Sequence, residues 1–240
     1  MYTLSSSHIY NVRMDKKVVA VIPARMDSSR FPAKMIADAS GKPLIQYAWE
    51  VANKAQSVTE VYIATDSEEI ATRVRAFGGE VIMTGIHPNG TSRIAQAVQD
   101  LNCDLVVNMQ GDEPELDPIV IDKTVEIIGD SVMATAACAL QSDEIENVNV
   151  VKAKIEGDFA IDFSRLSEND SLRHIGLYVY QLSFLQTYVA MQPTQNEIGR
   201  KLEQMRAIDN GYSIAVAIVE PQPGGIDTKE QYEEFVARLG

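Results

Sequence analysis

A cluster of positive charge follows the first apolar stretch of the sequence. Within the eleven residues 24–34 there are three basic residues and two serines, namely Arg25, Arg30, Lys34, Ser28 and Ser29. Guanidinium groups bind phosphate oxygens through paired hydrogen bonds, and an ammonium group acts as a point charge. The cluster stands against a formal net charge of −13 for the whole chain. These residue types suit a triphosphate, and a solvated basic loop is the alternative.

A second group of reactive side chains lies in the segment 108–114, which reads NMQGDEP. Gly111 would allow the backbone to approach a ligand, and Asp112 and Glu113 place two carboxylates beside it. Carboxylate oxygens are the ligands that Mg²⁺ prefers, and Mg²⁺ commonly pairs with phosphates. The segment therefore predicts a metal-assisted phosphate site, with an ordinary turn as the alternative.

The elements that position these groups follow a strand–helix alternation. The apolar, β-branched run Val18–Ile22 predicts a strand buried on both faces, and Pro23 should end its ladder because proline lacks an N–H. The other elements expected in this half are strands at Glu60–Thr65, Glu80–Thr84 and Asp104–Met109, and helices at Leu44–Ala55, Ser67–Phe77 and Thr91–Leu101. This spacing is typical of a parallel, doubly wound sheet, whose ligands bind at the carboxyl ends of the strands. Both motifs should therefore lie side by side.

The second half predicts shorter, clustered strands and hence a mixed or antiparallel extension. We expect strands at Val132–Ala139, Val150–Ile155, Phe159–Ser164, His174–Tyr180 and Ser213–Val219, and helices at Pro118–Ile128, Leu182–Met191, Asn196–Asn210 and Thr228–Leu239. Asp66, Thr91 and Asp227 are the expected N-caps of three helices. The sequence shows no linker, so we interpret residues 16–240 as one domain after a disordered extension, 1–15.

Composition narrows the functional classes. The 240 residues are 45% hydrophobic and 23% charged, as in ordinary globular proteins. The acidic balance argues against a nucleic-acid partner, and no apolar run reaches the ~20 residues that span a bilayer. The two cysteines, Cys103 and Cys138, lie in apolar segments, which favours a reduced cytoplasmic protein. Neither G-x-G-x-x-G after the first strand nor a P-loop motif is present.

Several motifs carry a family resemblance. The segment IPAR-x-x-S-S-R-F-P-x-K (22–34) and QGDEP (110–114) resemble the acidic-sugar cytidylyltransferases, most closely the 3-deoxy-manno-octulosonate (Kdo) cytidylyltransferase family. The later segments 88–93, 147–152, 162–165, 173–178, 202–206 and 225–228 are similar to further motifs of that family, in the same order. The chain departs from the pattern at Asn89 and Ser92, and in a shortened loop after Arg165. A further family acid corresponds to Arg200 here or is shifted to Glu197.

The resemblance implies a fold and an activity. The fold would be a doubly wound, mostly parallel mixed sheet of the nucleotide-diphospho-sugar transferase type with a small β-rich extension. Residues 18–130 would bind the nucleotide, and residues 131–240 would form the sugar pocket and the dimer contact. The enzyme would join CMP from CTP to the anomeric hydroxyl of a 3-deoxy-2-ulosonic acid such as Kdo and release pyrophosphate. Such an enzyme would be a cytoplasmic homodimer that serves lipopolysaccharide or surface-polysaccharide synthesis.

The resemblance also implies roles for individual residues. The catalytic residues would be Arg25, Lys34 and Asp112, and Mg²⁺ would be held by Asp112 and Asp227. The nucleotide would contact Ala24, Arg25, Ser28, Lys34, Gly90, Arg93 and Gln110. The sugar would contact Gln110, Arg165, His174, Tyr178 and Glu203. The guanidinium of Arg165 suits a carboxylate. Structural roles for Arg165 and His174 remain equal alternatives.

Three other functions remain open on the sequence alone. The same chemistry could act on another acid sugar, a modified Kdo or a nonulosonate, because two departures fall near the sugar pocket. A sugar-1-phosphate nucleotidyltransferase would normally show a G-x-G-T-R-type opening, which this chain lacks. A non-catalytic nucleotide-binding protein would not need two metal carboxylates.

Overall fold

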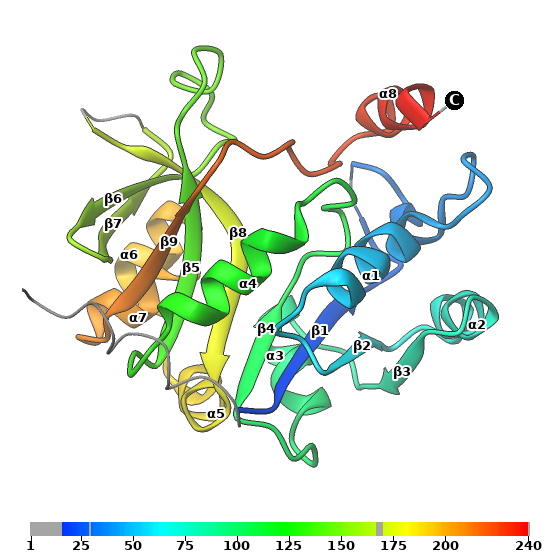
Figure 1. The fold of residues 1–240 in the computed structure, drawn as a ribbon, viewed down its shortest axis with the longest axis horizontal. Helices are drawn as coiled ribbons and strands as arrows, with labels where there is room; N and C mark the ends of the chain where they lie inside the picture. The colour runs from blue at the N-terminus through cyan, green and yellow to red at the C-terminus, as the bar shows by residue number, and fades with distance from the viewer. Residues whose placement is uncertain (1–15, 29, 167–169, 240) are drawn as a thin grey trace, which may run out of the picture.

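The computed structural model describes residues 16–28, 30–166 and 170–239, so the expected extension 1–15 lies outside it. In the described residues nine strands form a single mixed sheet in the order β3-β2-β1-β4-β8-β5-β9-β7-β6 (Figure 1). The first half contains β1 Val18–Ala24, η1 Lys34–Ile36, α1 Leu44–Lys54, β2 Glu60–Thr65, α2 Glu68–Ala76, β3 Glu80–Met83, α3 Gly90–Ala97 and β4 Leu105–Asn108. The second half contains α4 Pro118–Ile127, β5 Met133–Cys138, β6 Lys152–Glu156, β7 Phe159–Ser164, β8 Leu172–Gln181, α5 Leu182–Ala190, α6 Gln195–Arg200, α7 Met205–Asp209, β9 Ile214–Val219 and α8 Lys229–Leu239.

The first four strands are parallel, as their alternation with helices predicted. β1 pairs with β2 on one side and with β4 on the other, and β2 pairs with β3. Successive side chains of a strand point to opposite faces of a sheet. Accordingly Ala20 and Ile22 belong to one buried cluster, while Val19 and Val21 belong to another on the opposite face. β1 is therefore covered on both sides, which explains its unbroken apolar sequence.

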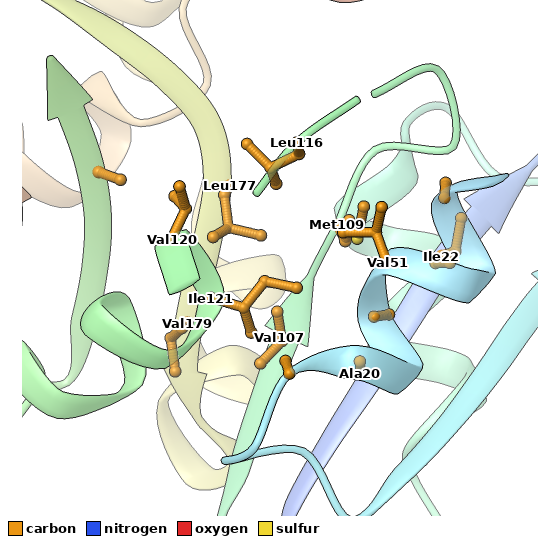
Figure 2. Close-up of a cluster of buried hydrophobic side chains, with 14 of the residues drawn as sticks. Ala20, Ile22, Val51, Val107, Met109, Leu116, Val120, Ile121, Leu177 and Val179 are labelled. Carbon is orange, nitrogen blue, oxygen red and sulfur yellow. The ribbon is translucent and has the colours of Figure 1, made fainter. Parts of the chain in front are cut away.

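Helices contribute to the core on both faces of the sheet. Figure 2 shows Val51 of α1 beside Met109, and Ile121 of α4 beside Val107 of β4. Ile94 of α3 belongs to the cluster on the other face, with contributions from α5 and α7. Burying these apolar surfaces is the main stabilising contribution to a core of this kind.

The expectation that Pro23 ends the β1 ladder is wrong. Pro23 and Ala24 still pair with Ala64 and Thr65 of β2. The backbone groups of odd-numbered β1 residues face β4, as the Met109 N–H donation to the Val21 carbonyl shows. The β1–β4 pairing ends at Val21, so the missing N–H of Pro23 faces a position where no partner strand remains.

In the second half β8 reverses the strand direction. It is antiparallel to both β4 and β5, whereas β5 is parallel to β9. β6 and β7 form an antiparallel hairpin at the edge of the sheet. The mixed character expected for this half is therefore confirmed, and the fold is α/β with a mixed sheet.

Three helix caps differ from those expected from the sequence. The side chains that accept a hydrogen bond from the backbone N–H three residues later are Ser67, Asn89 and Thr228, instead of Asp66, Thr91 and Asp227. In each case the true cap lies one or two residues from the expected one. The three displaced side chains consequently remain available for other contacts.

The helix expected over Asn196–Asn210 is two helices, α6 and α7. Lys201 adopts a left-handed conformation with φ 56°, which ends α6. The turn that follows buries Leu202 in the same cluster as Met205 of α7 and leaves Glu203 facing α3. None of the described helices is long and apolar enough to cross a membrane. Cys103 and Cys138 are free and buried, as their apolar surroundings predicted.

Candidate active site

The basic loop and the acidic turn meet at the carboxyl ends of β1 and β4, as expected. Lys34 is buried, and its Nζ donates to Asp112 Oδ2 at 2.6 Å and to the Ile226 carbonyl at 2.6 Å. Its Nζ also lies 3.9 Å from Asp227 Oδ1. One ammonium group therefore lies between the two carboxylates that the sequence singled out as metal ligands.

Asp227 reaches this position on the segment 220–228, which we call the strap. The strap runs from the end of β9 across the sheet edge to α8 (Figure 1, orange to red). The Ile226 N–H donates to the Asp112 carbonyl at 2.8 Å. Arg30 Nη2 donates to Asp227 Oδ1 at 2.7 Å. Two segments far apart in the chain are thus joined by backbone and charged contacts.

Glu113 is a third acid in this region, and its side chain is the second carboxylate that the sequence placed beside Gly111. Burial, followed by the charge of Asp112, raises the pKa of Glu113 to about 7. A Cβ on Gly225 of the strap would lie 3.0 Å from Glu113 Oε1. The strap therefore covers Glu113 closely, and glycine at 225 permits that approach.

The remaining residues of the basic loop differ in their exposure. Ala24 is buried and ends β1, Ser28 is half-buried, and Arg25 is exposed. Of the three cations in the loop, Arg30 and Lys34 contact carboxylates of the site. The exposed guanidinium of Arg25 can approach a ligand from solvent.

The segment 88–93 contributes one close approach and one buried charge. A Cβ on Gly90 would lie 3.0 Å from Pro23 Cγ, so glycine allows α3 to begin against the end of β1. Arg93 is buried, and its Nη1 lies 2.7 Å from Thr84 Oγ1 and 3.2 Å from Asp66 Oδ1. The guanidinium of Arg93 therefore braces the ends of β2 and β3, and its expected contact with the nucleotide stays a prediction.

A second polar group surrounds Glu203, which follows α6. Thr91 Oγ1 donates to Glu203 Oε2 at 3.2 Å. Glu203 Oε1 is the one buried side-chain oxygen or nitrogen among the described residues that lacks a hydrogen-bond partner. Burial raises the pKa of Glu203, and the Thr91 hydrogen bond opposes that shift. An unpaired buried carboxylate oxygen is costly, so this atom suits a ligand that donates a hydrogen bond.

His174 and Tyr178 lie on β8, and Gln110 follows β4, the strand paired with β8. His174 is buried, its Nε2 lies 2.9 Å from Thr135 Oγ1, and burial lowers its pKa to about 3. The His174 and Tyr178 rings are 5.4 Å apart, and burial raises the pKa of Tyr178. A Cβ on Gly176 would lie 3.9 Å from Gln110 Cγ. With these pKa values, the rings of His174 and Tyr178 are uncharged near neutral pH.

Arg165 and Arg200 bind elements of the edge hairpin region. Arg165 Nη1 donates to the Val148 carbonyl at 3.2 Å. Arg200 Nη1 donates to Asp162 Oδ1 at 2.5 Å and to the Phe163 carbonyl at 2.8 Å. Glu197, the alternative position for the family acid, is buried and forms an ion pair with Arg206. The described contacts of Arg165 are thus structural, and its contact with the sugar stays a prediction.

A cavity adjoins Glu203 on the outer side of α3. Its volume is about 590 Å³, within the range of small-molecule sites. Two departures from the family motif, Asn89 and Ser92, line it together with Arg206 and Lys201. The cavity therefore adds space beside the Glu203 side chain.

The arrangement can neutralise and orient phosphates at one end and bind hydroxyl groups at the other. In the described part of the chain no three Asp, Glu, His or Cys side chains are grouped to hold a metal ion. The two aspartates that share Lys34 are hard oxygen donors, and Mg²⁺ typically takes only one or two carboxylates with water and substrate phosphates. The donor set thus fits Mg²⁺ carried with a nucleotide.

Comparisons with known proteins identify the relatives of this chain. The cytidylyltransferase family model matches residues 19–214. A 3-deoxy-manno-octulosonate cytidylyltransferase of Geotalea uraniireducens (strain Rf4) is 37% identical over 248 residues, covering 93% of this chain and 99% of the relative. One of the same name from Anaeromyxobacter sp. (strain K) is 40% identical over 238 residues, covering 93% and 98%.

Solved structures show the same fold. The structure of CMP:2-keto-3-deoxy-manno-octonic acid synthetase complexed with CTP has a TM-score of 0.88 at 33% identity and covers 93% of this chain and 98% of that one. A 4-diphosphocytidyl-2C-methyl-D-erythritol synthase from Anaerococcus prevotii, at 13% identity and a TM-score of 0.64, shares the fold alone. The chain therefore belongs to the cytidylyltransferase family, in the group of the 3-deoxy-manno-octulosonate cytidylyltransferases.

Proposed function

We propose that this protein is a CTP-dependent enzyme that transfers CMP to the anomeric hydroxyl of Kdo and releases pyrophosphate. The observation that carries the proposal is the contact of Lys34 with Asp112 and Asp227, because it unites the basic loop, the acidic turn and the strap at one sheet edge. The similarity to Kdo cytidylyltransferases over 93% of the chain supports the same reaction.

The nucleotide is assigned to the carboxyl ends of β1 and β4. Exposed Arg25 and the ammonium of Lys34 supply positive charge for the triphosphate, and Ser28 supplies a hydroxyl donor. Ala24, Gly90, Arg93 and Gln110 are proposed to border the nucleoside. The close approach of Gly90 to Pro23 supports this placement, because it keeps side chains away from the end of β1.

Mg²⁺ is assigned to Asp112 and Asp227. When bound, it would neutralise charge on the phosphates and lower the pKa of the attacking hydroxyl. The chain contributes the two carboxylates, and Lys34 supplies a positive charge beside them. Asp112, Arg25 and Lys34 are the residues proposed to act at the reacting phosphate.

The acid sugar is assigned to the region of Gln110, Tyr178 and Glu203. The unpaired Glu203 Oε1 supports this placement, because a sugar hydroxyl can donate to it. Neutral His174 would hold the shape of the pocket or contact the sugar, and Arg165 would bind the sugar carboxylate. With both substrates in place, the anomeric oxygen attacks the α-phosphorus, the bond to pyrophosphate breaks, and the hydroxyl proton passes to solvent. Positioning and charge neutralisation supply most of the acceleration.

The wider setting is also proposed. Helices on both faces of the parallel strands support the doubly wound description, with residues 18–130 serving the nucleotide and residues 131–240 serving the sugar and a homodimer contact. The product would feed lipopolysaccharide or surface-polysaccharide synthesis in the cytoplasm. A related acid sugar is the second candidate substrate, because Asn89 and Ser92 line the cavity beside Glu203.

The test is pyrophosphate release from CTP and Mg²⁺, with Kdo in one reaction and other ulosonic acids in parallel. Release of pyrophosphate with Kdo is expected. Release only with another acid would show the same reaction with a different sugar substrate. Asp112→Asn should remove most of the turnover while leaving the fold intact. Near-normal turnover in that variant would refute the role of Asp112.

A further inference from the structure

The strap has a second attachment, remote from Lys34, through Arg173 of β8. Arg173 Nη1 donates to the Gln222 carbonyl at 2.5 Å, and Nη2 donates to the Pro223 carbonyl at 3.0 Å. Nη1 also lies 3.2 Å from Glu144 Oε1, and the Arg173 side chain is only 11% exposed. The planar guanidinium therefore binds two consecutive carbonyls and one carboxylate.

The sheet register explains why Arg173 reaches the strap. Cys138 of β5 pairs with Arg173 of β8 on one side and with Val219, the last residue of β9, on the other. The strap begins immediately after Val219. A long side chain from β8 can therefore extend along the sheet edge and bind the first residues that leave the sheet.

The start of the strap is held by side-chain contacts, whereas Ile226 near its other end is buried and bonded to Asp112 and Lys34. Residues 220–227 form neither helix nor strand. Gln222 is buried, and its Oε1 accepts from the Asp117 N–H at 3.0 Å. Four residues after Pro223 comes Asp227, which contacts Lys34 and Arg30 near Asp112. The Arg173 contacts and the Gln222 contact thus fix the start of a short irregular segment whose other end carries a site carboxylate.

We propose that Arg173 is a positioning residue that fixes the strap so that Asp227 faces Asp112. This inference rests on the proposed metal role of Asp227. Without the Arg173 contacts, the strap would hold Asp227 opposite Asp112 only part of the time. The apparent dissociation constant for Mg²⁺ rises as the fraction of protein with the strap in place falls, whereas turnover at saturating Mg²⁺ changes little.

The obvious rival explanation is that Arg173 only stabilises the fold. Arg200 offers a matched control, because it also binds one carboxylate and one backbone carbonyl but attaches α6 to β7. Arg173→Met and Arg200→Met remove the same kinds of contacts at separate places. Arg173→Lys keeps the charge and loses the planar fork, so it should fall between wild type and Arg173→Met.

The first measurement is amide hydrogen exchange in the metal-free, full-length protein. The Ile226 N–H, bonded to the Asp112 carbonyl, should exchange about tenfold faster or more in Arg173→Met if the strap opens locally. The same amide should be unchanged in Arg200→Met. Unchanged protection of Ile226 in a folded Arg173→Met would overturn the proposal.

The second measurement is the Mg²⁺ dependence of pyrophosphate release at saturating CTP and sugar. Arg173→Met should raise the Mg²⁺ midpoint about tenfold and keep maximal turnover within about twofold. A loss of turnover that excess Mg²⁺ does not restore, with an unchanged midpoint, would contradict the positioning role. If Arg173→Met does not fold, Arg173→Lys and Glu144→Gln, which removes the charge facing the guanidinium, carry the same test. If wild type needs no divalent ion, the proposed metal role fails, while the Ile226 exchange still decides whether Arg173 holds the strap.

Discussion

Replacing Lys34 with methionine should separate two functions of its ammonium group. In the metal-free protein the ammonium neutralises Asp112 and Asp227 and donates to the Ile226 carbonyl. With substrate it is proposed to bind phosphate. Methionine keeps the apolar stem and removes the charge, so Lys34→Met should lose turnover and destabilise the metal-free fold at the same time.

The size of the stability loss follows from the contacts. Lys34 Nζ makes two hydrogen bonds of 2.6 Å that involve a charged donor, each worth roughly 1.5–3 kcal/mol. Part of the loss is recovered, because the Asp112 and Asp227 side chains are 26% and 44% exposed and can be hydrated. We expect a net loss of about 2–3 kcal/mol in the free energy of unfolding. For a domain of this size that corresponds to a melting temperature lower by roughly 5–10 °C.

Mg²⁺ should compensate for the missing ammonium. In wild type the ion must compete with Lys34 for the two carboxylates, whereas in Lys34→Met they are free. At one hundred times its dissociation constant a ligand stabilises the folded state by about 2.7 kcal/mol, which is close to the expected loss. Mg²⁺ without nucleotide should therefore raise the melting temperature of Lys34→Met more than that of wild type.

The assay is thermal and urea unfolding in EDTA and in a Mg²⁺ series. Lys42→Met is the control, because Lys42 pairs with Glu50 at 2.9 Å on the surface. Its loss should cost under about 1 kcal/mol and leave the Mg²⁺ response unchanged. If Mg²⁺ stabilises Lys34→Met no more than wild type, the two aspartates do not form the metal site and the reasoning fails.

Two further predictions concern the sugar end of the site. His174 has a pKa lowered to about 3 by burial, below the 6.5 of an ordinary histidine, so its neutral form stabilises the fold above pH 6.5 and this contribution is lost as the pH falls toward 3. His174→Asn should flatten the acid side of the stability curve by up to roughly 1.4 kcal/mol per pH unit, measured by urea midpoints, and an unchanged slope would show that His174 is not a buried neutral group. Glu203→Gln should raise KM for the acid sugar by about tenfold or more, as expected for losing a hydrogen bond to a charged acceptor, with KM for CTP nearly constant. Equal increases in both KM values would remove Glu203 from the sugar site.

Much of the fold follows from local patterns. The apolar run of β1 and the strand–helix alternation predicted the parallel half, because burial on both faces requires such sequences. The caps and the break at Lys201 were missed for a physical reason. Neighbouring polar residues such as Asp66 and Ser67 have similar capping ability, so tertiary contacts decide which one caps the helix. Here Asp66 forms an ion pair with buried Arg93, and Ser67 is the cap.

The sequence by itself determined the chemistry available at the site. Arg25, Lys34 and Asp112 are recognisable by residue type and by their place after strands, whereas Asp227 was expected only as a helix cap. Their meeting at one edge could be expected for Lys34 and Asp112, because carboxyl ends of parallel strands share an edge. The family resemblance supplied the remaining assignments.

Only the tertiary structure decided how these groups are paired. The position of the strap depends on β8 entering the sheet antiparallel between β4 and β5, which brings Arg173 beside the end of β9. The position of Glu203 depends on the turn after Lys201, which directs its Oε2 toward Thr91 and leaves its Oε1 without a partner. Both arrangements arise from contacts between residues distant in the chain, and no local pattern of the sequence specifies them.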